Sequence, residues 1–166
     1  MHAITIRPET QGDQATIFAL TTAAFAEMPF SDGDEPALVD SLRRDGDLTL
    51  SLVAEDAQRI VGHIAFSPVT IADGSLDWFG LGPVSVWPEL QKQGIGGALI
   101  QRGIADLRER GARGIILLGS PVYYSRFGFE HDPALTYPGP PAEYFQRLVL
   151  DGDAPSGQVS YAPAFG

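Results

Sequence analysis

The chain of 166 residues contains no cysteine, which excludes disulfides, thiolate metal sites and cysteine nucleophiles together. Its three histidines, His2, His63 and His131, lack the spacing of metal ligands, so we predict no metal site. Cationic residues are also scarce, because 11 Lys and Arg stand against 21 Asp and Glu, for a formal net charge of −10. Such an acidic surface repels phosphate backbones. We therefore expect no nucleic-acid partner and favour cationic small molecules or basic peptides.

Long apolar runs are absent as well, since none approaches the roughly 18 residues that a membrane-spanning helix needs. The first ten residues, MHAITIRPET, show no basic stretch followed by an apolar core, so no signal peptide is expected. Together with the lack of cysteine, this predicts a cytoplasmic protein without a membrane partner. The length and the apolar share of 44% are typical of one globular domain, expected to span residues 1–166.

Strand-like and helix-like periodicities alternate along the chain. A short alternating strand is expected over 3–7, a helix ending at Phe25, and a second helix from Pro36 to Asp45. The later elements are a hairpin, a strand, a long amphipathic helix, a short buried strand and two C-terminal strands, expected over 48–56 and 59–71, 78–86, 95–110, 114–118, 144–150 and 158–162. This order predicts a mixed α/β fold in which helices cover one sheet.

Three glycines, Gly94, Gly96 and Gly97, stand where the long helix should begin. Glycine costs roughly 1 kcal/mol relative to alanine inside a helix, so another constraint must place them there. The N–H groups of a first helical turn have no partner within the helix and lie at the positive end of its dipole. Without Cβ atoms an anion can approach those groups closely, and Lys92 can add a charge. The turn therefore predicts a phosphate site, while Gly96 and Gly103 also lie on the inward arc and favour close helix–sheet contact.

The two common nucleotide motifs do not match this turn. A Walker A loop needs Gly-Lys-Ser/Thr, which the chain lacks, and the dinucleotide fingerprint needs a third glycine where Leu99 stands.

Gln91-x-x-Gly94-x-Gly96, preceded by Val84-x-Val86, instead resembles the acyl-CoA signature of the GNAT superfamily of N-acetyltransferases. The later stretch from Tyr124 to Phe129, YSRFGF, is similar to that family's tyrosine-to-Gly-Phe motif. The resemblance covers residues 3–130, leaves 142–163 as a two-strand extension, and extends in detail to a bacterial subgroup of predicted N-acetyltransferases. It implies a GNAT-like mixed, mostly antiparallel central sheet flanked by helices, and an enzyme that uses acetyl-CoA as co-substrate without a metal.

The resemblance also implies the cofactor contacts. The turn that would bind the pyrophosphate of acetyl-CoA consists of Gln91, Lys92, Gln93, Gly94, Ile95, Gly96 and Gly97. Backbone groups of Val84, Ser85 and Val86 would bind the pantetheine arm and polarise the thioester carbonyl. Many family members carry a cofactor-binding asparagine where this chain has Gly119-Ser120-Pro121, so either Ser120 makes that contact or it is absent.

Tyr124 occupies the family's general-acid position and would protonate the leaving thiolate. The alternative is an aromatic ring that packs on the CoA arm, and we expect the neighbouring Tyr123 to lie in the core. His63 is either a catalytic base or a satisfied core histidine. Since no cysteine can carry the acetyl group, we expect direct attack by a primary amine in a ternary complex.

The acidic segment from Glu27 to Glu35 would border the acceptor site, with Glu27, Phe30 and Asp32 as candidate contacts and residues 144–150 approaching from the other side. Such a mouth favours a cationic small molecule or peptide amine with an apolar body; the alternative is a solvated acidic loop. The competing functions are a non-catalytic acyl-CoA-binding module and an unrelated anion-binding α/β protein. Either a monomer or a homodimer is compatible with the sequence.

Overall fold

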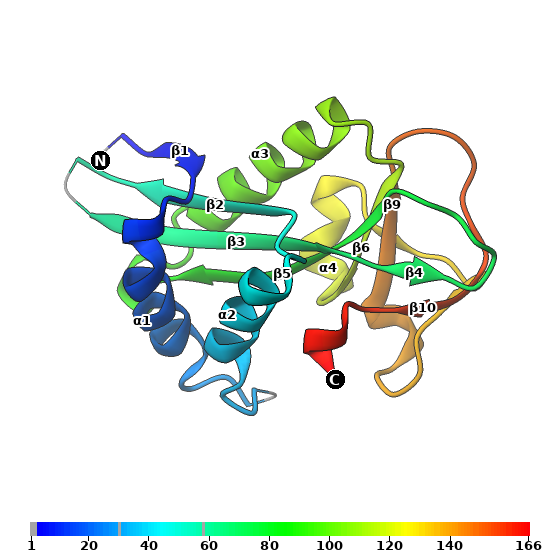
Figure 1. Cartoon of the computed structure of the whole chain (residues 1–166), viewed down its shortest axis with the longest axis horizontal. Helices are drawn as coiled ribbons and strands as arrows, with labels where there is room; N and C mark the ends of the chain where they lie inside the picture. The colour runs from blue at the N-terminus through cyan, green and yellow to red at the C-terminus, as the bar shows by residue number, and fades with distance from the viewer. Residues whose placement is uncertain (1–2, 30, 58) are drawn as a thin grey trace.

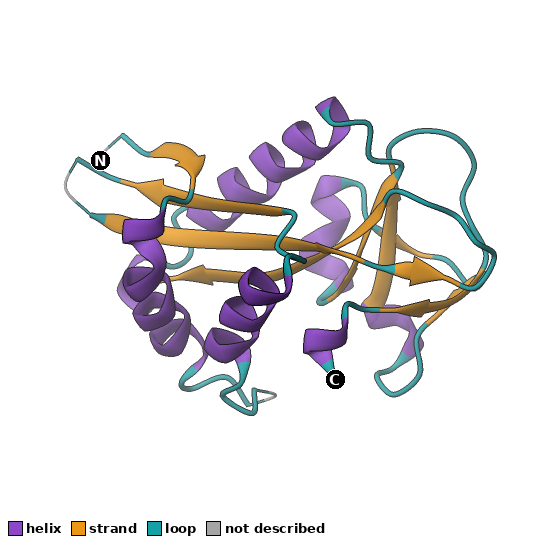
Figure 2. Ribbon diagram, in the orientation of Figure 1, coloured by secondary structure: helices purple, strands orange, loops and turns teal. Residues whose placement is uncertain are grey.

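A seven-stranded sheet forms the centre of the molecule in the computed structural model, which describes residues 3–29, 31–57 and 59–166 (Figures 1 and 2). The strands, in their order across the sheet, are β1 (Thr5–Pro8), β2 (Leu50–Glu55), β3 (Ile60–Pro68), β5 (Trp78–Val86), β6 (Gly114–Leu118), β9 (Phe145–Val149) and β7 (Glu130–His131). Neighbours pair antiparallel except β5 with β6, in the described part of the chain. The prediction of a mostly antiparallel sheet is confirmed.

Helices cover both faces of this sheet. Figure 1 shows α1 (Gln14–Phe25) and α2 (Glu35–Asp45) together on one face and α3 (Ile95–Glu109) on the other. The short α4 (Pro121–Tyr124) follows β6. Single 3-10 turns lie at Gln11–Asp13, Pro88–Leu90, Ser125–Phe127, Ala142–Tyr144 and Pro163–Phe165.

The two C-terminal strands expected over 142–163 join different sheets. β9 lies inside the central sheet, between β6 and β7, while β10 (Gly157–Ser160) joins β4 (Thr70–Ile71) and β8 (Leu135–Thr136) in a second, three-stranded sheet. The two-residue strands β7 and β8 were not predicted, because they are too short to show an alternation of apolar and polar residues. The end of the chain thus builds part of the main sheet.

The packing of α3 on the sheet follows its predicted apolar arc. The buried residues of this helix are Ile95, Leu99, Ile100, Gly103, Ile104 and Leu107. A Cβ atom at Gly103 would lie 2.4 Å from the ring of Phe66 on β3, far inside normal contact. Gly103 is therefore required by close helix–sheet packing, as expected.

β5 separates from β6 in the middle of the sheet. The two strands pair only where Trp78–Gly80 faces Gly114–Ile116. β5 then bulges at Gly82 and Pro83, where the register against β3 shifts, and Gly82 adopts φ +138°, a conformation that favours glycine. Val84 to Val86 continue along β3 without β6 beside them. The resulting opening positions the site described below.

A network of buried and partly buried polar side chains connects β2 and β3 with α2. The Ser51 hydroxyl donates to the Glu9 carboxylate, which also accepts two hydrogen bonds from Arg43. Since the Ser51 proton is then engaged, His63 donates from Nε2 to Ser51 Oγ over 2.7 Å. His63 Nδ1 is left as a buried acceptor without a partner among the described residues. His63 is fully buried, which supports a structural role rather than a catalytic one.

Acidification should destabilise the fold through His63. Burial lowers its pKa from 6.5 to about 4, with Glu9 opposing the shift and Arg43 adding to it. The unfolded chain therefore binds the extra proton first, so this stability is present above pH 6.5 and lost as the pH falls toward 4. Between pH 7.5 and 5 the linkage amounts to about 2 kcal/mol of unfolding free energy.

Urea unfolding at the two pH values, with His63→Gln as the control, measures this contribution. We expect the wild type to lose about 2 kcal/mol more than the variant on acidification. Equal losses in both proteins would assign the acid sensitivity to other groups.

Candidate functional site

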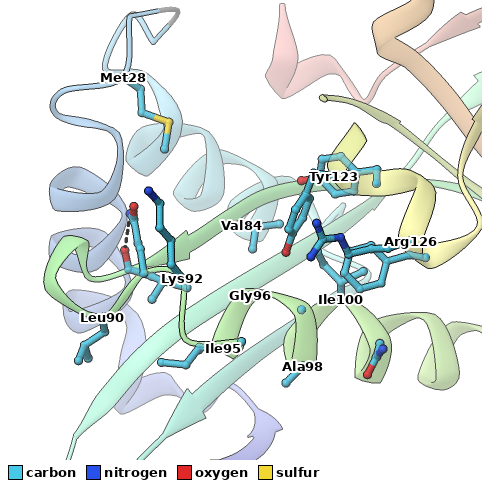
Figure 3. Close-up of a pocket in the computed structure, with 17 residues that line it drawn as sticks. Met28, Val84, Leu90, Lys92, Ile95, Gly96, Ala98, Ile100, Tyr123 and Arg126 are labelled. Carbon is cyan, nitrogen blue, oxygen red and sulfur yellow. Dashed lines mark hydrogen bonds between the residues drawn. The ribbon is translucent and has the colours of Figure 1, made fainter. Parts of the chain in front are cut away.

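A cavity of about 900 Å³ lies where β5 leaves β6, bordered by the start of α3 and by α4 (Figure 3). Its lining residues come from the α1–α2 connection, β5, the turn into α3, α3 itself and the Tyr/Phe-rich segment: Met28, Val84, Val86, Leu90, Gln91, Lys92, Gly94, Ile95, Gly96, Gly97, Ala98, Ile100, Gln101, Tyr123, Tyr124, Arg126 and Phe127. Most of the predicted cofactor residues are in this set, although they come from separate segments of the chain.

The first turn of α3 presents unpaired N–H groups to this cavity. Gly94 is the N-cap, with φ +88°, a left-handed conformation that explains a glycine at this position. Ala98 is the first residue whose N–H bonds back into the helix, to the Gly94 carbonyl at 3.0 Å. The N–H groups of Ile95, Gly96 and Gly97 therefore remain for a ligand, at the positive end of the dipole.

Gly96 lines the cavity, and packing does not require a glycine at this position. A Cβ atom there would lie 3.8 Å from Tyr123 Oη and 3.9 Å from Val86, which is ordinary van der Waals contact. The expectation that Gly96, like Gly103, permits close helix–sheet contact is wrong. A side chain at this position would project over the N–H groups and block an anion from approaching them.

The charges at the cavity are opposite to the charge of the whole chain. Lys92 and Arg126 line it, and no carboxylate does so among the described residues. Figure 3 shows Gly96 between these two cations, and the Arg126 guanidinium lies 4.6 Å from the centre of the Tyr123 ring. In a protein with a net charge of −10, such a local excess of positive charge favours a polyanionic ligand.

The free edge of β5 supplies backbone hydrogen-bonding groups. Gln91 Nε2 donates to the Val86 carbonyl over 3.1 Å, so the Val86 backbone faces away from β3. Because backbone groups of alternate residues point to the same edge of a strand, those of Val84 face the same opening. Ser85 instead turns its backbone toward β3, and its buried side chain has no hydrogen-bond partner among the described residues. An extended polar chain can thus pair with Val84 and Val86.

Three of the predicted cofactor residues lie outside the lining of the cavity. These are Ser85, the exposed Gln93, and Ser120, whose hydroxyl accepts the Tyr123 N–H at 3.3 Å and caps α4. Their contacts with a cofactor stay predictions.

The sequence-based interpretation missed one side of the cavity. Tyr123 lines it together with Arg126 and Phe127, although its ring also packs, partly buried, against the core as expected. The helical spacing of these three residues, i, i+3 and i+4, places them on one face and was the signal available in the sequence.

Tyr124 lies at the junction of this cavity with a second one, because it lines both. Its ring packs so closely on Gly119 that a Cβ atom there would be 2.4 Å away. Burial, with Tyr123 nearby, raises the pKa of Tyr124 to about 12. The phenol therefore keeps its proton throughout the physiological range and is a hydrogen-bond donor.

The second cavity, of about 460 Å³, shares Met28, Val84 and Tyr124 with the first. Its other lining residues come from α1, α2, the bulge of β5, the end of β6 and the C-terminal part of the chain: Phe25, Glu35, Leu38, Leu81, Gly82, Pro83, Leu118, Tyr137, Tyr161 and Phe165. Met28 and Glu35 bring it beside the acidic segment that the sequence predicted to border an acceptor site.

The predicted acceptor contacts are placed differently. Glu27 and Asp32 are exposed and line neither cavity, and Phe30 lies outside the described residues. Glu35, from the same acidic segment, lines the second cavity. The C-terminal wall comes from Tyr161 and Phe165, where residues 144–150 were expected.

In the described residues, no group of three or more His, Asp or Glu side chains could hold a metal ion. The helices in that part of the chain include none with the length and apolarity to cross a bilayer.

The cavity combines a helix N-terminus with free N–H groups, two flanking cations and an unpaired strand edge. These features are suited to an extended ligand that carries phosphate, in the class of α/β proteins with such a site. Residues 5–131 match the family model described as an acetyltransferase (GNAT) domain. The chain therefore belongs to the GNAT acetyltransferase family, and the family and fold predicted from the sequence are confirmed.

Individual relatives agree with this assignment. The uncharacterized N-acetyltransferase YhbS of Escherichia coli is 39% identical over 149 residues, covering 86% of this chain and 89% of YhbS. A GNAT family acetyltransferase from Brucella melitensis, solved in complex with acetyl-CoA, is 47% identical, with a TM-score of 0.89 and full coverage of both chains. The structure of E. coli YhbS in complex with CoA gives 35% identity and a TM-score of 0.90, covering 99% of this chain and 93% of YhbS. The first of these structures contains acetyl-CoA, the co-substrate predicted from the sequence, and the second contains CoA, which lacks the acetyl group.

Replacing Gly96 tests the first cavity. Gly96→Glu has room for its Cβ atom, so the fold should persist, but the carboxylate would repel a phosphate from the α3 N-terminus. Hydrogen bonds to charged groups contribute about 1.5–3 kcal/mol each, so the Kd for CoA should rise roughly 10- to 150-fold. Isothermal titration calorimetry measures the change.

Ala105→Glu, an exposed position on the same helix, adds the same charge away from the cavity and should leave the Kd near the wild-type value. Gly103→Ala should lower the melting temperature instead, because its methyl group would meet Phe66. Unchanged CoA affinity in folded Gly96→Glu would refute the assignment of the site.

Proposed function

We propose that the chain transfers the acetyl group of acetyl-CoA to a primary amine by direct attack in a ternary complex. The observation that carries this proposal is the junction of two cavities at Val84 and Tyr124. One cavity is cationic and suits a polyanion, whereas the other is mostly apolar and contains a carboxylate. A direct reaction between two bound substrates requires that their binding cavities adjoin each other.

In the first cavity, acetyl-CoA would lie with its pyrophosphate on the N–H groups of Ile95, Gly96 and Gly97. Lys92 and Arg126 would add charge to this contact. The pantetheine arm would run along the free edge of β5 and pair with Val84 and Val86. The acetyl-CoA and CoA complexes of the two relatives with TM-scores of 0.89 and 0.90 support this placement of the co-substrate.

The reaction then requires three events at the junction. The neutral amine nitrogen attacks the thioester carbonyl carbon, and a backbone N–H on the free edge of β5 stabilises the oxyanion. The carbon–sulfur bond breaks, and the thiolate takes a proton from the Tyr124 hydroxyl. The acceptor nitrogen loses one proton to solvent, which restores the tyrosine over the cycle. No acetyl-enzyme on a cysteine can form, since the chain has none.

The base need not be a side chain. His63 is fully buried on β3, lines neither of the two cavities, and its burial-lowered pKa of about 4 makes it a weak base. An amine that is partly neutral at the working pH attacks without a dedicated carboxylate, and water removes the proton afterwards.

A panel of primary amines tests the proposed activity by release of free CoA thiol from acetyl-CoA. Because the chain has no cysteine, a thiol-reactive dye would report CoA alone. Thiol release that depends on the amine, with matching acetylamine by mass spectrometry, is the expected result. Tight CoA binding without transfer to any amine would favour a non-catalytic acyl-CoA-binding module.

Tyr124→Phe should lower kcat by about 10²- to 10⁴-fold, because it removes the proton donor and keeps the ring. The affinity for acetyl-CoA should change little. Tyr123→Phe, which removes the neighbouring hydroxyl from the first cavity, is the matched control and should affect kcat far less. Steady-state kinetics and single-turnover rates measure both variants, and an unchanged chemical step in Tyr124→Phe would make Tyr124 a packing residue.

A further inference from the structure

Glu35 is the only charged residue among the described residues that line the second cavity. It lies at the start of α2, and its carboxylate accepts a hydrogen bond from the Ser31 hydroxyl. This bond holds the carboxylate in place and leaves acceptor capacity on its two oxygens. Glu35 is also half-buried, whereas the other carboxylates of the segment, Glu27, Asp32 and Asp34, are exposed.

The remaining walls of the second cavity are apolar or aromatic. Tyr161 is packed edge-on against Tyr137 at 5.1 Å between ring centres and lies 4.9 Å from Phe165. A Cβ atom at Gly80 would lie 2.9 Å from the Tyr161 ring, so this glycine makes room for the ring against β5. The rings therefore form a fixed wall that suits a flat, apolar body.

The size of the cavity limits the acceptor. Its volume of about 460 Å³ is within the range of sites for small molecules. The C-terminal 3-10 turn, Pro163–Phe165, lies beside α2 (Figure 1), and its Phe165 lines the cavity. A small acceptor with one ring suits a half-open cavity of this volume, in which the aromatic residues form one wall.

From these contacts we infer that the acceptor is a small primary amine on an aromatic or bulky apolar body, and that Glu35 selects it by binding its ammonium group. This inference rests on the proposed acetyltransferase function and assigns the substrate class of the same site. The carboxylate attracts the cationic form into the cavity, and the ring wall binds the body. The ammonium then loses a proton to water, and the neutral amine reacts at the end of the cavity lined by Tyr124 and Val84. Anionic amines are rejected, because their carboxylates would lie in an apolar cavity beside Glu35.

Glu35→Gln separates charge from shape in this cavity. With 2-phenylethylamine as the acceptor, we expect KM to rise about tenfold in the variant, since a hydrogen bond to a charged partner is lost. Inhibition by the neutral isostere 2-phenylethanol should be unchanged. Asp34→Asn removes an exposed neighbouring charge that lines neither cavity and is the matched control, with less than about a twofold change in KM.

Phe165→Ala tests the aromatic wall independently. It should weaken 2-phenylethylamine and 2-phenylethanol to the same degree, because both depend on the ring contact. A phenylalanine-amide dipeptide should be a poorer acceptor than 2-phenylethylamine, and ethanolamine and glutamate poorer still.

Calorimetry of 2-phenylethylamine binding to the CoA-loaded protein distinguishes a failure of this inference from a failure of the proposed acetyl transfer. Equal effects of Glu35→Gln and Asp34→Asn, or a preference for glutamate, ethanolamine or the dipeptide, would overturn the inference while acetyl transfer stands. Loss of amine binding in Glu35→Gln without turnover of any amine by the wild type would uphold the cavity assignment and overturn the proposed function. No binding of 2-phenylethylamine to the wild type would overturn the inference.

Discussion

The separation of β5 from β6 beyond Gly80 is the constraint on which the site depends. A strand inside a sheet normally satisfies its backbone groups on both edges, and leaving one edge unpaired is unfavourable unless water or a ligand replaces the partner. The bulge at Gly82 and Pro83 turns β5 toward β3 at this point. β9 meanwhile pairs with all of β6, from Gly114 to Leu118, and holds it on the far side of the opening. The fold thus keeps the gap open from both sides.

The two cavities that meet at this opening carry opposite charges. The first cavity carries Lys92 and Arg126, the second carries Glu35, and Tyr124 lies between them as an uncharged donor. A carboxylate in the first cavity would repel a polyanion, and a cation in the second cavity would repel an ammonium group. The excess negative charge of the whole chain therefore says little about either cavity, and local placement determines what each can bind.

Local patterns in the sequence predicted the elements that frame the site. The helical periodicity of apolar residues in α3 and the apolar runs of β5 and β6 can be read from neighbouring residues alone. The bounds of these three elements were therefore predicted to within one residue. The family motif likewise located the α3 N-terminus. The position of Tyr123 at the cavity was indicated only by its i, i+3 and i+4 spacing with Arg126 and Phe127, a weak signal because α4 is a helix of four residues. Glu35 and Phe165 line the same cavity although they are far apart in the sequence, and no local pattern in the sequence indicates this proximity.

The glycines of α3 show why sequence and structure were both needed. Gly94 is required by a left-handed backbone, and Gly103 by the Phe66 ring 2.4 Å from its missing Cβ atom. Gly96 meets neither condition, since its φ is helical and a Cβ atom would have space. Among the described residues, neither a left-handed backbone nor a crowded Cβ position requires glycine there, which agrees with the proposed approach of a phosphate to the N–H groups of the helix. Glycine at this position therefore supports the proposed co-substrate site, whereas Gly94 and Gly103 are explained by the fold alone.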